Sequence, residues 1–515
     1  MRVEECVAER YVTRSLVLAG LGGALCAVNV TVISSLGADA AAPSERARIA
    51  AVTRPTTNFD KPEPFERRPA GAATVFKALN ADIFSHASAN MSFERELQFK
   101  VGNGIFRKVW VSAPSSTKSS DGLGPLFNAR SCQHCHLKDG RGHVPAKGER
   151  AIAMFLRLSI PPRNAAERAA LKSGKAAVIP DPTYGGQLQN FAIRGVAAEG
   201  RMEIRYEDQP VKLADGTVVT LRKPHYKAAG LRYGPAHPGL MISPRLAPPM
   251  IGVGLLEAIA ARDILAGADP DDRNGDGISG RANRVWSEEY GKVMLGRFGW
   301  KAGQPTVAQQ SAGAFLGDIG LSTPIFGAHA GDCTSAQKLC RQAPNGAGGP
   351  AGGTTEVPKA MFDLVVFYSR NLGVPARRSL HDKQVLKGKA LFYRSGCIGC
   401  HRPKFVTRRL PDRPEQSFQL IWPYTDLLLH DMGEGLADKR PEGRASGSEW
   451  RTAPLWGIGL AKTVNPRATF LHDGRARTLL EAILWHGGEA EAAKQRVVEM
   501  SRSERAALLA FLRSL

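Results

Sequence analysis

Hydrophobic and polar residues follow a helical period over several stretches of this chain. Apolar positions recur every three to four residues across 361–372, 386–393 and 505–515, and Ser503 stands where an N-cap would begin the last helix. Mixed apolar and polar positions across residues 74–110 also fit helices. The pattern predicts a fold that is mostly α.

Between residues 185 and 233 an alternating pattern of apolar and polar residues interrupts the helical period. Residues 202–206 alternate between apolar and polar side chains, and two short apolar runs flank Asp215-Gly216. Alternation indicates strands, and Asp-Gly between two such runs is a hairpin signal. We therefore predict a β-rich insertion at about residues 185–235.

The N-terminus has the pattern of an export signal. Arg10 and Arg14 precede an uncharged, mostly apolar run over residues 15–36, and Ala38-Asp39-Ala40 offers a small-x-small cleavage site. We predict a signal peptide over residues 1–40, a periplasmic location and no membrane span after cleavage. The run is long for a signal, so an uncleaved N-terminal membrane anchor is the alternative.

Cys-x-x-Cys-His occurs twice, and this is the attachment pattern of c-type haem. The two thiols bond to the haem vinyl groups and the adjacent histidine ligates the iron. A single copy could also be a redox pair, a disulfide or half a zinc site. Two copies behind an export signal favour two covalent haem c groups. The residues are Cys132, Cys135, His136, Cys397, Cys400 and His401.

The remaining cysteines agree with an exported protein. The chain has eight cysteines. Cys6 and Cys26 lie in the export segment, four belong to the haem patterns, and Cys333 and Cys340 remain. In an oxidising compartment we expect Cys333 and Cys340 to form a disulfide rather than two free thiols.

An internal repeat suggests that the haem-binding unit is duplicated. Residues 245–255 resemble residues 451–460, with one residue more in the first copy. We predict two cytochrome c-like domains, an N-terminal one over residues 41–345 and a C-terminal one over 355–515. The glycine-rich stretch 346–353 would lie at their boundary, and the β-rich insertion would enlarge the first domain.

The sixth ligand of each iron decides between electron transfer and catalysis. For the second haem the best candidate is His486, which follows His401 by a distance suited to a distal ligand; Met432 and Met500 are rivals. In the first domain we expect the matching segment to be residues 271–286, which contain neither His nor Met. This predicts an open first iron.

Two residues of the predicted first domain bear on that prediction. Glu257, just after the first repeat copy, is our candidate for a catalytic acid–base group, although a surface or helix-end carboxylate would look the same. His143 is the alternative sixth ligand, although only a short loop separates it from His136.

A turn at residues 272–278 resembles the start of a calcium loop. Asp272, Asn274 and Asp276 place oxygens at the first, third and fifth positions, and Gly277 supplies the bend. The twelfth position is Asn283 instead of the usual glutamate. The alternatives are a bound calcium ion and an ordinary polar turn.

The net charge of +21 constrains the partners. No dense basic run or basic stripe with interleaved aromatics is present, so we expect a basic solvated surface and no nucleic acid. The charge also favours docking to an acidic redox protein. Trp286, Trp300 and Trp422 are candidates for an indole between the haems, although each could simply be a core residue.

Several longer stretches resemble the bacterial di-haem oxidoreductase family, which is related to di-haem cytochrome c peroxidases. They are residues 121–132, 275–281, 424–433, 447–452 and 470–474, and the resemblance spans about residues 71–515. It implies a peroxidase in which the N-terminal haem meets peroxide and the C-terminal haem receives electrons.

The resemblance also bears on the ligands. In the relatives a motif like residues 470–474 precedes an axial methionine, and His486 stands in that place, so bis-His ligation would lower the potential of the second haem. The relatives' distal histidine lies farther from the first haem pattern than His143 does. The alternatives to a peroxidase are an oxidase of a protein or thiol substrate and a non-catalytic electron carrier.

Overall fold

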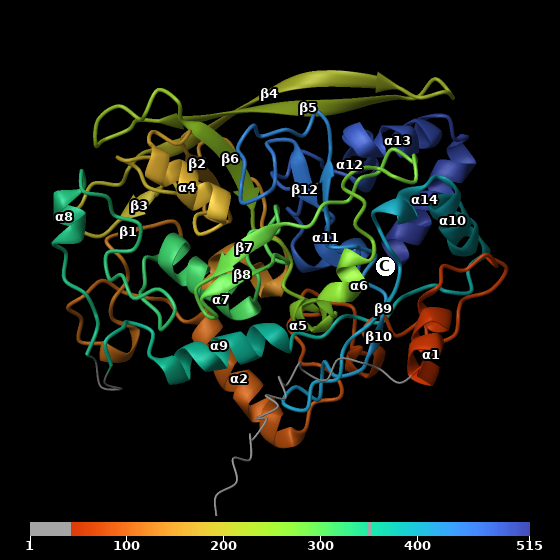
Figure 1. Ribbon diagram of the computed structural model, residues 1–515, viewed down its shortest axis with the longest axis horizontal. Helices are drawn as coiled ribbons and strands as arrows, with labels where there is room; N and C mark the ends of the chain where they lie inside the picture. Colours follow the sequence, from red (N-terminus) through yellow and green to blue (C-terminus); the bar gives the residue numbers. More distant parts are fainter. Residues whose placement is uncertain (1–42, 349–352) are drawn as a thin grey trace, which may run out of the picture.

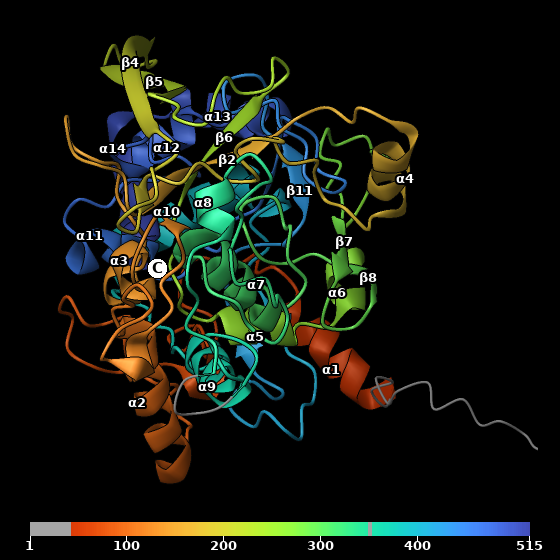
Figure 2. The same ribbon diagram turned by 90° about the vertical axis from the view of Figure 1, so that its left-hand side faces the viewer.

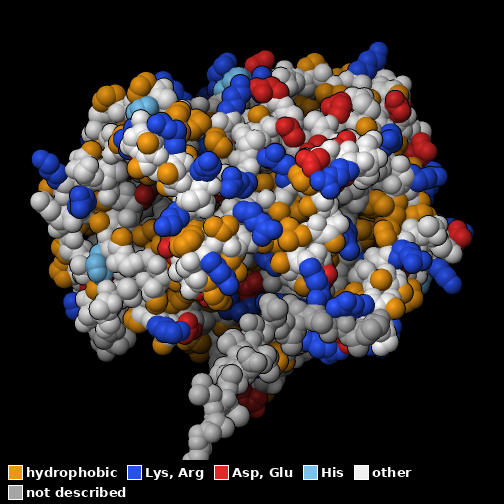
Figure 3. All heavy atoms as spheres, viewed as in Figure 1, with side chains coloured by type: hydrophobic (Ala, Val, Ile, Leu, Met, Phe, Trp, Pro, Cys, Tyr) orange, Lys and Arg blue, Asp and Glu red, His pale blue; other side chains and the backbone are white. Residues whose placement is uncertain are grey.

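The computed structural model describes residues 43–348 and 353–515. The signal peptide predicted over residues 1–40, with its Cys6 and Cys26, lies outside these ranges. None of the described helices is long and apolar enough to cross a membrane. Lys and Arg side chains are scattered over the face shown in Figure 3, with acidic side chains among them.

Two pairs of long helices frame the molecule. Helix α2 (Phe93–Arg107) packs against α9 (Lys359–Arg370), and α10 (Lys383–Arg394) packs against α14 (Arg502–Ser514). The α2–α9 pair forms the lower part of Figure 1, and the α10–α14 pair lies at its right. Helix α9, predicted to open the second domain, thus packs against the first half of the chain.

A glycine at each crossing lets the helices approach closely. A Cβ on Gly102 of α2 would lie 2.4 Å from the Leu364 carbonyl oxygen, and one on Gly388 of α10 would lie 1.9 Å from the Ala507 carbonyl oxygen. Any larger residue would force the backbones apart. Helix α14 begins three residues earlier than predicted, because Ser501 and Glu504 form a capping box in place of a cap at Ser503.

The predicted hairpin is present and long. Strand β4 (Arg201–Lys212) pairs antiparallel with β5 (Val218–Ala229) around a turn in which Gly216 has a φ of +82°. The hairpin extends along the upper edge of Figure 1, over both halves of the chain. Its inner face contacts the second half, where Arg222 Nε donates to the Arg475 carbonyl at 2.9 Å.

The prediction of a mostly α fold made of two cytochrome c-like domains is wrong. The described chain is a mixture of helices, long loops and six two-stranded sheets. Short strands inside loop-rich segments carry too few residues to give a clear alternating pattern, so the sequence does not reveal them. These pairs are β1–β3, β2–β6, β7–β8, β9–β10 and β11–β12, besides β4–β5.

One hydrophobic core joins the two halves of the chain. Its largest buried cluster contains Phe84 and Leu255 from the first half together with Leu427 and Trp456 from the second. Burial of this shared apolar surface is the main force that holds the halves against each other. The halves therefore fold as one body, while the predicted residue limits of two domains stay a prediction.

The remaining elements are short. The other helices are α1 (Pro43–Thr53), α3 (Cys132–Cys135), α4 (Ala165–Ser173), α5 (Val253–Ala258), α6 (Ala261–Leu265), α7 (Val307–Ala314), α8 (Lys338–Arg341), α11 (Ala461–Val464), α12 (Leu479–Leu484) and α13 (Glu491–Val498). Helix α4 and the β7–β8 pair lie at one side of the body (Figure 2). The other strands are β1 (Leu126–Phe127), β2 (Met154–Ser159), β3 (Phe191–Ala192), β6 (Met241–Leu246), β7 (Arg284–Ser287), β8 (Lys292–Leu295), β9 (Phe405–Val406), β10 (Leu420–Ile421), β11 (Leu429–Asp431) and β12 (Glu449–Arg451).

Candidate functional site

A cavity of about 550 Å³ lies between the two halves of the chain. Its lining is mainly apolar, and both Cys-x-x-Cys-His segments contribute to it. The four thiols of these segments are free, whereas Cys333 and Cys340 are joined in a disulfide. The lining residues from the two segments are Cys132, Cys135, His136, Cys397, Cys400 and His401.

The first segment forms helix α3 and ends at His136. The His136 Nδ1–H donates to the Pro248 carbonyl oxygen at 2.8 Å, because a carbonyl can only accept. Burial lowers the pKa of His136 to about 4, so the imidazole is neutral near pH 7. The remaining nitrogen, Nε2, therefore carries a lone pair that can ligate a metal.

The second segment repeats this arrangement with a different carbonyl. The His401 Nδ1–H donates to the Tyr424 carbonyl oxygen at 2.9 Å, and burial lowers the pKa of His401 to about 4. The two histidines are thus held in the same tautomer by the same kind of contact. Both are prepared as neutral nitrogen ligands inside one cavity.

His486 lies on the same cavity, just beyond helix α12. Its Nδ1–H donates to the Ala482 carbonyl at 2.7 Å, which again leaves Nε2 as the free nitrogen. His486 is close enough to His401 for its charge to help lower the pKa of His401. Met432 also lines the cavity, whereas Met500 packs in a separate core cluster.

A loop repeated in the two halves brings the cavity walls together. Phe298 N donates to the Gln304 carbonyl at 3.0 Å, and Phe470 N donates to the Ala476 carbonyl at 2.7 Å, so both loops close in the same register. Each loop leads directly into a helix, α7 in the first half and α12 in the second.

Both helices start from a threonine cap. Thr306 Oγ1 accepts from Gln309 N, and Thr478 Oγ1 accepts from Glu481 N. His486 is eight residues beyond its threonine, and the residue eight beyond Thr306 is Ala314, which also lines the cavity. The first half therefore presents a methyl group where the second presents an imidazole.

This register corrects the segment that we matched to the His486 region. The equivalent stretch is residues 298–314 and not 271–286, because the latter forms the calcium-like turn and strand β7. The conclusion that no His or Met stands at that position is unchanged. The sequence signal that could have found the match is the shared spacing from phenylalanine to threonine in the two loops.

Glu257 does not line the cavity. It accepts hydrogen bonds from Val307 N at 2.8 Å, Arg370 Nε at 2.7 Å and Arg413 Nη1 at 2.5 Å. Burial alone would raise the pKa of Glu257, but Arg370 and Arg413 outweigh it and hold the pKa below its usual range. A carboxylate fixed in this way ties α5 to its neighbours, and its position does not support a catalytic role.

Asp318 is a carboxyl group on the cavity that the sequence did not reveal. It follows Ala314 in a π-helical turn and accepts from Gln187 Nε2 at 2.9 Å. Burial raises the pKa of Asp318, since a charged carboxylate is poorly solvated there. Asp318 therefore retains a proton to higher pH than an exposed aspartate.

His143 and the three candidate calcium ligands, Asp272, Asn274 and Asp276, do not line the cavity, whereas Ile278 at the end of the same turn does. Asn465 Nδ2 donates to His143 Nδ1 at 3.2 Å, and His143 is not part of the cavity wall. In the turn, Asn274 Nδ2 donates to Asp276 Oδ2 at 3.2 Å, and Asp272 accepts from Gly277 N. The turn is closed by its own hydrogen bonds, and calcium binding stays a prediction.

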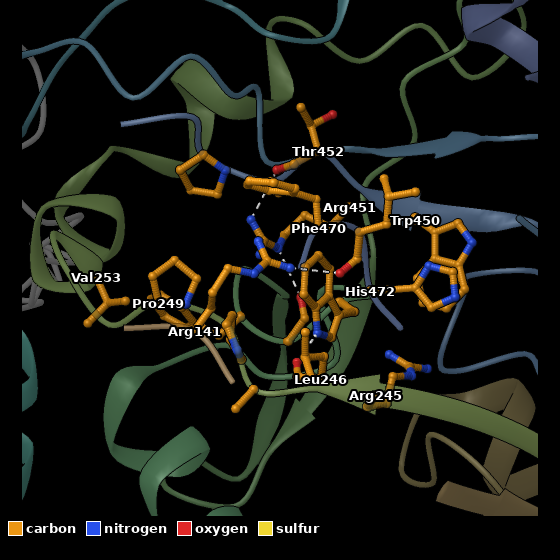
Figure 4. A pocket seen from close by; sticks show the side chains of 18 of the residues that line it. Arg141, Arg245, Leu246, Pro249, Val253, Trp450, Arg451, Thr452, Phe470 and His472 are labelled. Atoms are coloured by element: carbon orange, nitrogen blue, oxygen red, sulfur yellow. Dashed lines mark hydrogen bonds between the residues drawn. The ribbon is translucent and has the colours of Figure 1, made fainter. Parts of the chain in front are cut away.

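Aromatic and arginine side chains fill the junction between the two repeated loops (Figure 4). Trp300 lines the cavity and donates from Nε1 to the Leu246 carbonyl at 2.7 Å. Its counterpart in the second loop is His472, 6.5 Å away between ring centroids. Of the three tryptophans singled out from the sequence, Trp300 lines the cavity, while Trp286 and Trp422 do not.

His430 is a further residue that sequence reasoning missed. It lies between two carboxylates, with Nδ1 2.6 Å from Glu489 and Nε2 2.8 Å from Asp426. Burial alone would lower the pKa of His430, but the hydrogen bonds to Asp426, Cys400 and Glu489 raise it. His430 Nδ1 is also 3.5 Å from Cys400 Sγ, so a charged imidazolium stands beside the second thiol pair.

Residues 66–515 match the protein family described as "Di-haem oxidoreductase, putative peroxidase". The chain belongs to this family. No curated protein matches it. Among solved structures, hydrazine synthase from Kuenenia stuttgartiensis, pressurized with xenon, aligns at 19% identity with a TM-score of 0.20, covering 30% of this chain and 55% of that one. The di-haem oxidoreductase thus spans about half the length of that chain.

The residues on the cavity fit two haem groups. Each Cys-x-x-Cys-His segment offers two free thiols and a neutral histidine whose Nε2 is available. The remaining cavity walls are largely apolar. Apolar walls suit a porphyrin ring, and a backbone carbonyl on Nδ1 is the usual way to orient a histidine ligand. The donor set of this di-haem oxidoreductase is therefore consistent with its family.

Proposed function

We propose that this protein is an exported c-type di-haem oxidoreductase that reduces peroxide at the first site with electrons that enter through the second. Cys132 and Cys135 would hold one haem, with His136 as its ligand, and the second thiol pair would hold the other, with His401. The observation that carries the proposal is the contrast between Ala314 and His486 at equivalent positions of the repeated loop and helix.

At the first site the chain leaves room for a small oxidant. Haem supplies an iron that can bind peroxide and exchange electrons. Ala314 has no atom that could ligate this iron, and Gln310 and Ser311, one turn earlier on α7, put polar groups on the same cavity. Asp318, whose pKa burial raises, would supply a proton there to the departing oxygen.

At the second site His401 and His486 would both hold the haem iron, as suits electron transfer. Trp300 lines the same cavity, and its indole is fixed by a hydrogen bond to the Leu246 carbonyl. Overall, one peroxide takes up two electrons and two protons and leaves as two waters. The electrons come from a reduced redox protein, and the net charge of +21 favours an acidic one.

Spectroscopy of two matched variants tests the proposal. We expect EPR of the oxidised protein to show one high-spin and one low-spin ferric haem. Ala314→His should convert the high-spin signal to low-spin and abolish the response to peroxide. Ala314→Leu, which adds bulk without a ligand, should keep the high-spin signal.

His486→Ala tests the second site. This variant keeps His136 and Ala314, and we expect it to convert the low-spin ferric signal to a high-spin one. Two low-spin haems in the native protein would contradict the open first site and indicate an electron carrier. A high-spin haem with no turnover of peroxide and reduced donor would instead favour oxidation of a protein or thiol substrate.

A further inference from the structure

Two buried arginines on the cavity lack an acidic partner. Arg245 Nη2 lies 3.1 Å from Glu442, and Arg440 Nη1 lies 2.8 Å from the same carboxylate, so these two cations are neutralised within the protein. In the described ranges, neither Arg141 nor Arg451 has a carboxylate within 4.0 Å, although they are only 7% and 8% exposed. Both line the same cavity.

Arg141 is held by a single backbone contact. Its Nη2 donates to the Leu471 carbonyl at 2.8 Å, and its buried Nε has no hydrogen-bond partner. The guanidinium lies over the rings of Trp300 and Phe470, 5.8 Å and 5.5 Å from their centroids. Burial lowers the pKa of Arg141 to about 10, so the side chain is still a cation at pH 7.

Arg451 is arranged in a corresponding way on the other half. Its Nε donates to the Gly299 carbonyl at 2.9 Å and its Nη1 to the Thr452 carbonyl at 3.0 Å. Burial lowers its pKa to about 10 as well, against the opposing effect of the nearby Asp426 charge. Gly299 and Leu471 are equivalent positions of the repeated loops, and both arginines point into the cavity in Figure 4.

A buried cation without a carboxylate in contact is unfavourable, and backbone carbonyls supply only part of what water or a carboxylate would give. Arginine presents N–H donors in a fork that matches a carboxylate. A chain that keeps two such cations on one cavity is therefore built to receive anions there.

We propose that Arg141 and Arg451 bind the carboxylate side chains of the two haems, and so fix both haem edges at the junction of the repeated loops. This inference rests on the proposed function, since it requires haem at both sites. The same fork could instead serve a free carboxylate ligand that enters the cavity, and the experiment below separates the two sources.

The test measures haem midpoint potentials by spectroelectrochemistry on the holoprotein. A cation beside a haem carboxylate favours the reduced iron, so Arg141→Gln and Arg451→Gln should each shift at least one midpoint downward. Arg141→Lys keeps the positive charge and should shift the midpoint potential less than Arg141→Gln does. Arg297→Gln is the matched control: Arg297 is also buried, but it lies off the cavity and donates to the Leu256 carbonyl.

Titration of the native protein with acetate distinguishes the two sources. If haem carboxylates occupy the arginines, acetate should leave the haem spectrum and both potentials unchanged. An acetate-dependent spectral shift that is lost in Arg141→Gln would overturn the assignment in favour of a free carboxylate ligand.

The haem content of each variant separates this inference from the proposed function. Two covalent haems per chain with native potentials in both glutamine variants would refute the arginine assignment alone. A native chain without covalent haem would refute the proposed function. If Arg141→Gln does not fold, the midpoint potentials of Arg141→Lys and Arg451→Gln are measured instead. Native potentials in both of these variants would overturn the assignment.

Discussion

His472 stacks on Trp450, with ring centroids 3.6 Å apart and ring planes inclined by 13°. Two cations cover the indole as well, with Lys301 Nζ 4.5 Å and Arg245 Cζ 5.0 Å from its centroid. Burial lowers the pKa of His472 to about 3. The imidazole is therefore neutral in the folded protein, and proton uptake by His472 competes with folding.

This competition gives a pH dependence of stability. The pKa of His472 is about 3 in the folded state and about 6.5 when unfolded, so the unfolded chain binds an extra proton between these values. Stability from this group is present above pH 6.5 and is lost as the pH falls toward 3. We expect His472→Gln to reduce the fall in Tm between pH 6.5 and pH 4.5.

Thermal unfolding followed by circular dichroism across that range measures the effect. His381, an exposed histidine, provides the control substitution His381→Gln, which should leave the slope unchanged. Equal slopes for the native protein and His472→Gln would contradict the pKa shift.

Replacing Glu257 by glutamine should destabilise the protein without changing its chemistry. The substitution leaves Arg370 and Arg413 without their shared carboxylate, and the loss of one partner of a buried ion pair costs about 3–5 kcal/mol. Denaturant unfolding should show this loss, while peroxide turnover per folded molecule stays native. Glu288→Gln, at an exposed site, is the control; a changed pH profile of turnover in Glu257→Gln would restore a catalytic role.

Asp318→Asn should have the opposite effect to Glu257→Gln: it should change peroxide turnover while the stability of the protein stays native. Its raised pKa keeps the carboxyl protonated to higher pH, so native turnover should fall as the pH rises through that pKa. Asparagine cannot supply the proton, and we expect kcat to fall about 100-fold or more with the high-pH limb removed. Steady-state kinetics against pH checks this; an unchanged profile with native stability would exclude Asp318.

The sequence predicted the parts of the site that depend on short spacing. The two Cys-x-x-Cys-His segments and the hairpin at Gly216 are local patterns, whereas His486 was singled out from its distance to His401 and from the family resemblance. The fold class was wrong because the short strands pair across long loops. Arg141 became visible only in the structure, since its contact with Leu471 joins residues 330 positions apart.

The partners of Glu257 could not be predicted for a similar reason. Its two arginine partners come from separate segments far along the chain, so nothing near position 257 indicates that the carboxylate is already neutralised. The match between Ala314 and His486 was missed for a different reason. The repeated loops share spacing and backbone shape but few side chains, and a comparison of residue identities does not detect such a repeat.

The shared cavity also sets an order of assembly. Cys135 is only 5% exposed, and residues from both halves of the chain line the cavity that the first thiol pair faces. A porphyrin is far too large to pass through a closed, packed core. If haem is attached to these thiols as we propose, attachment would therefore precede the closing of the two halves of the chain around the cavity.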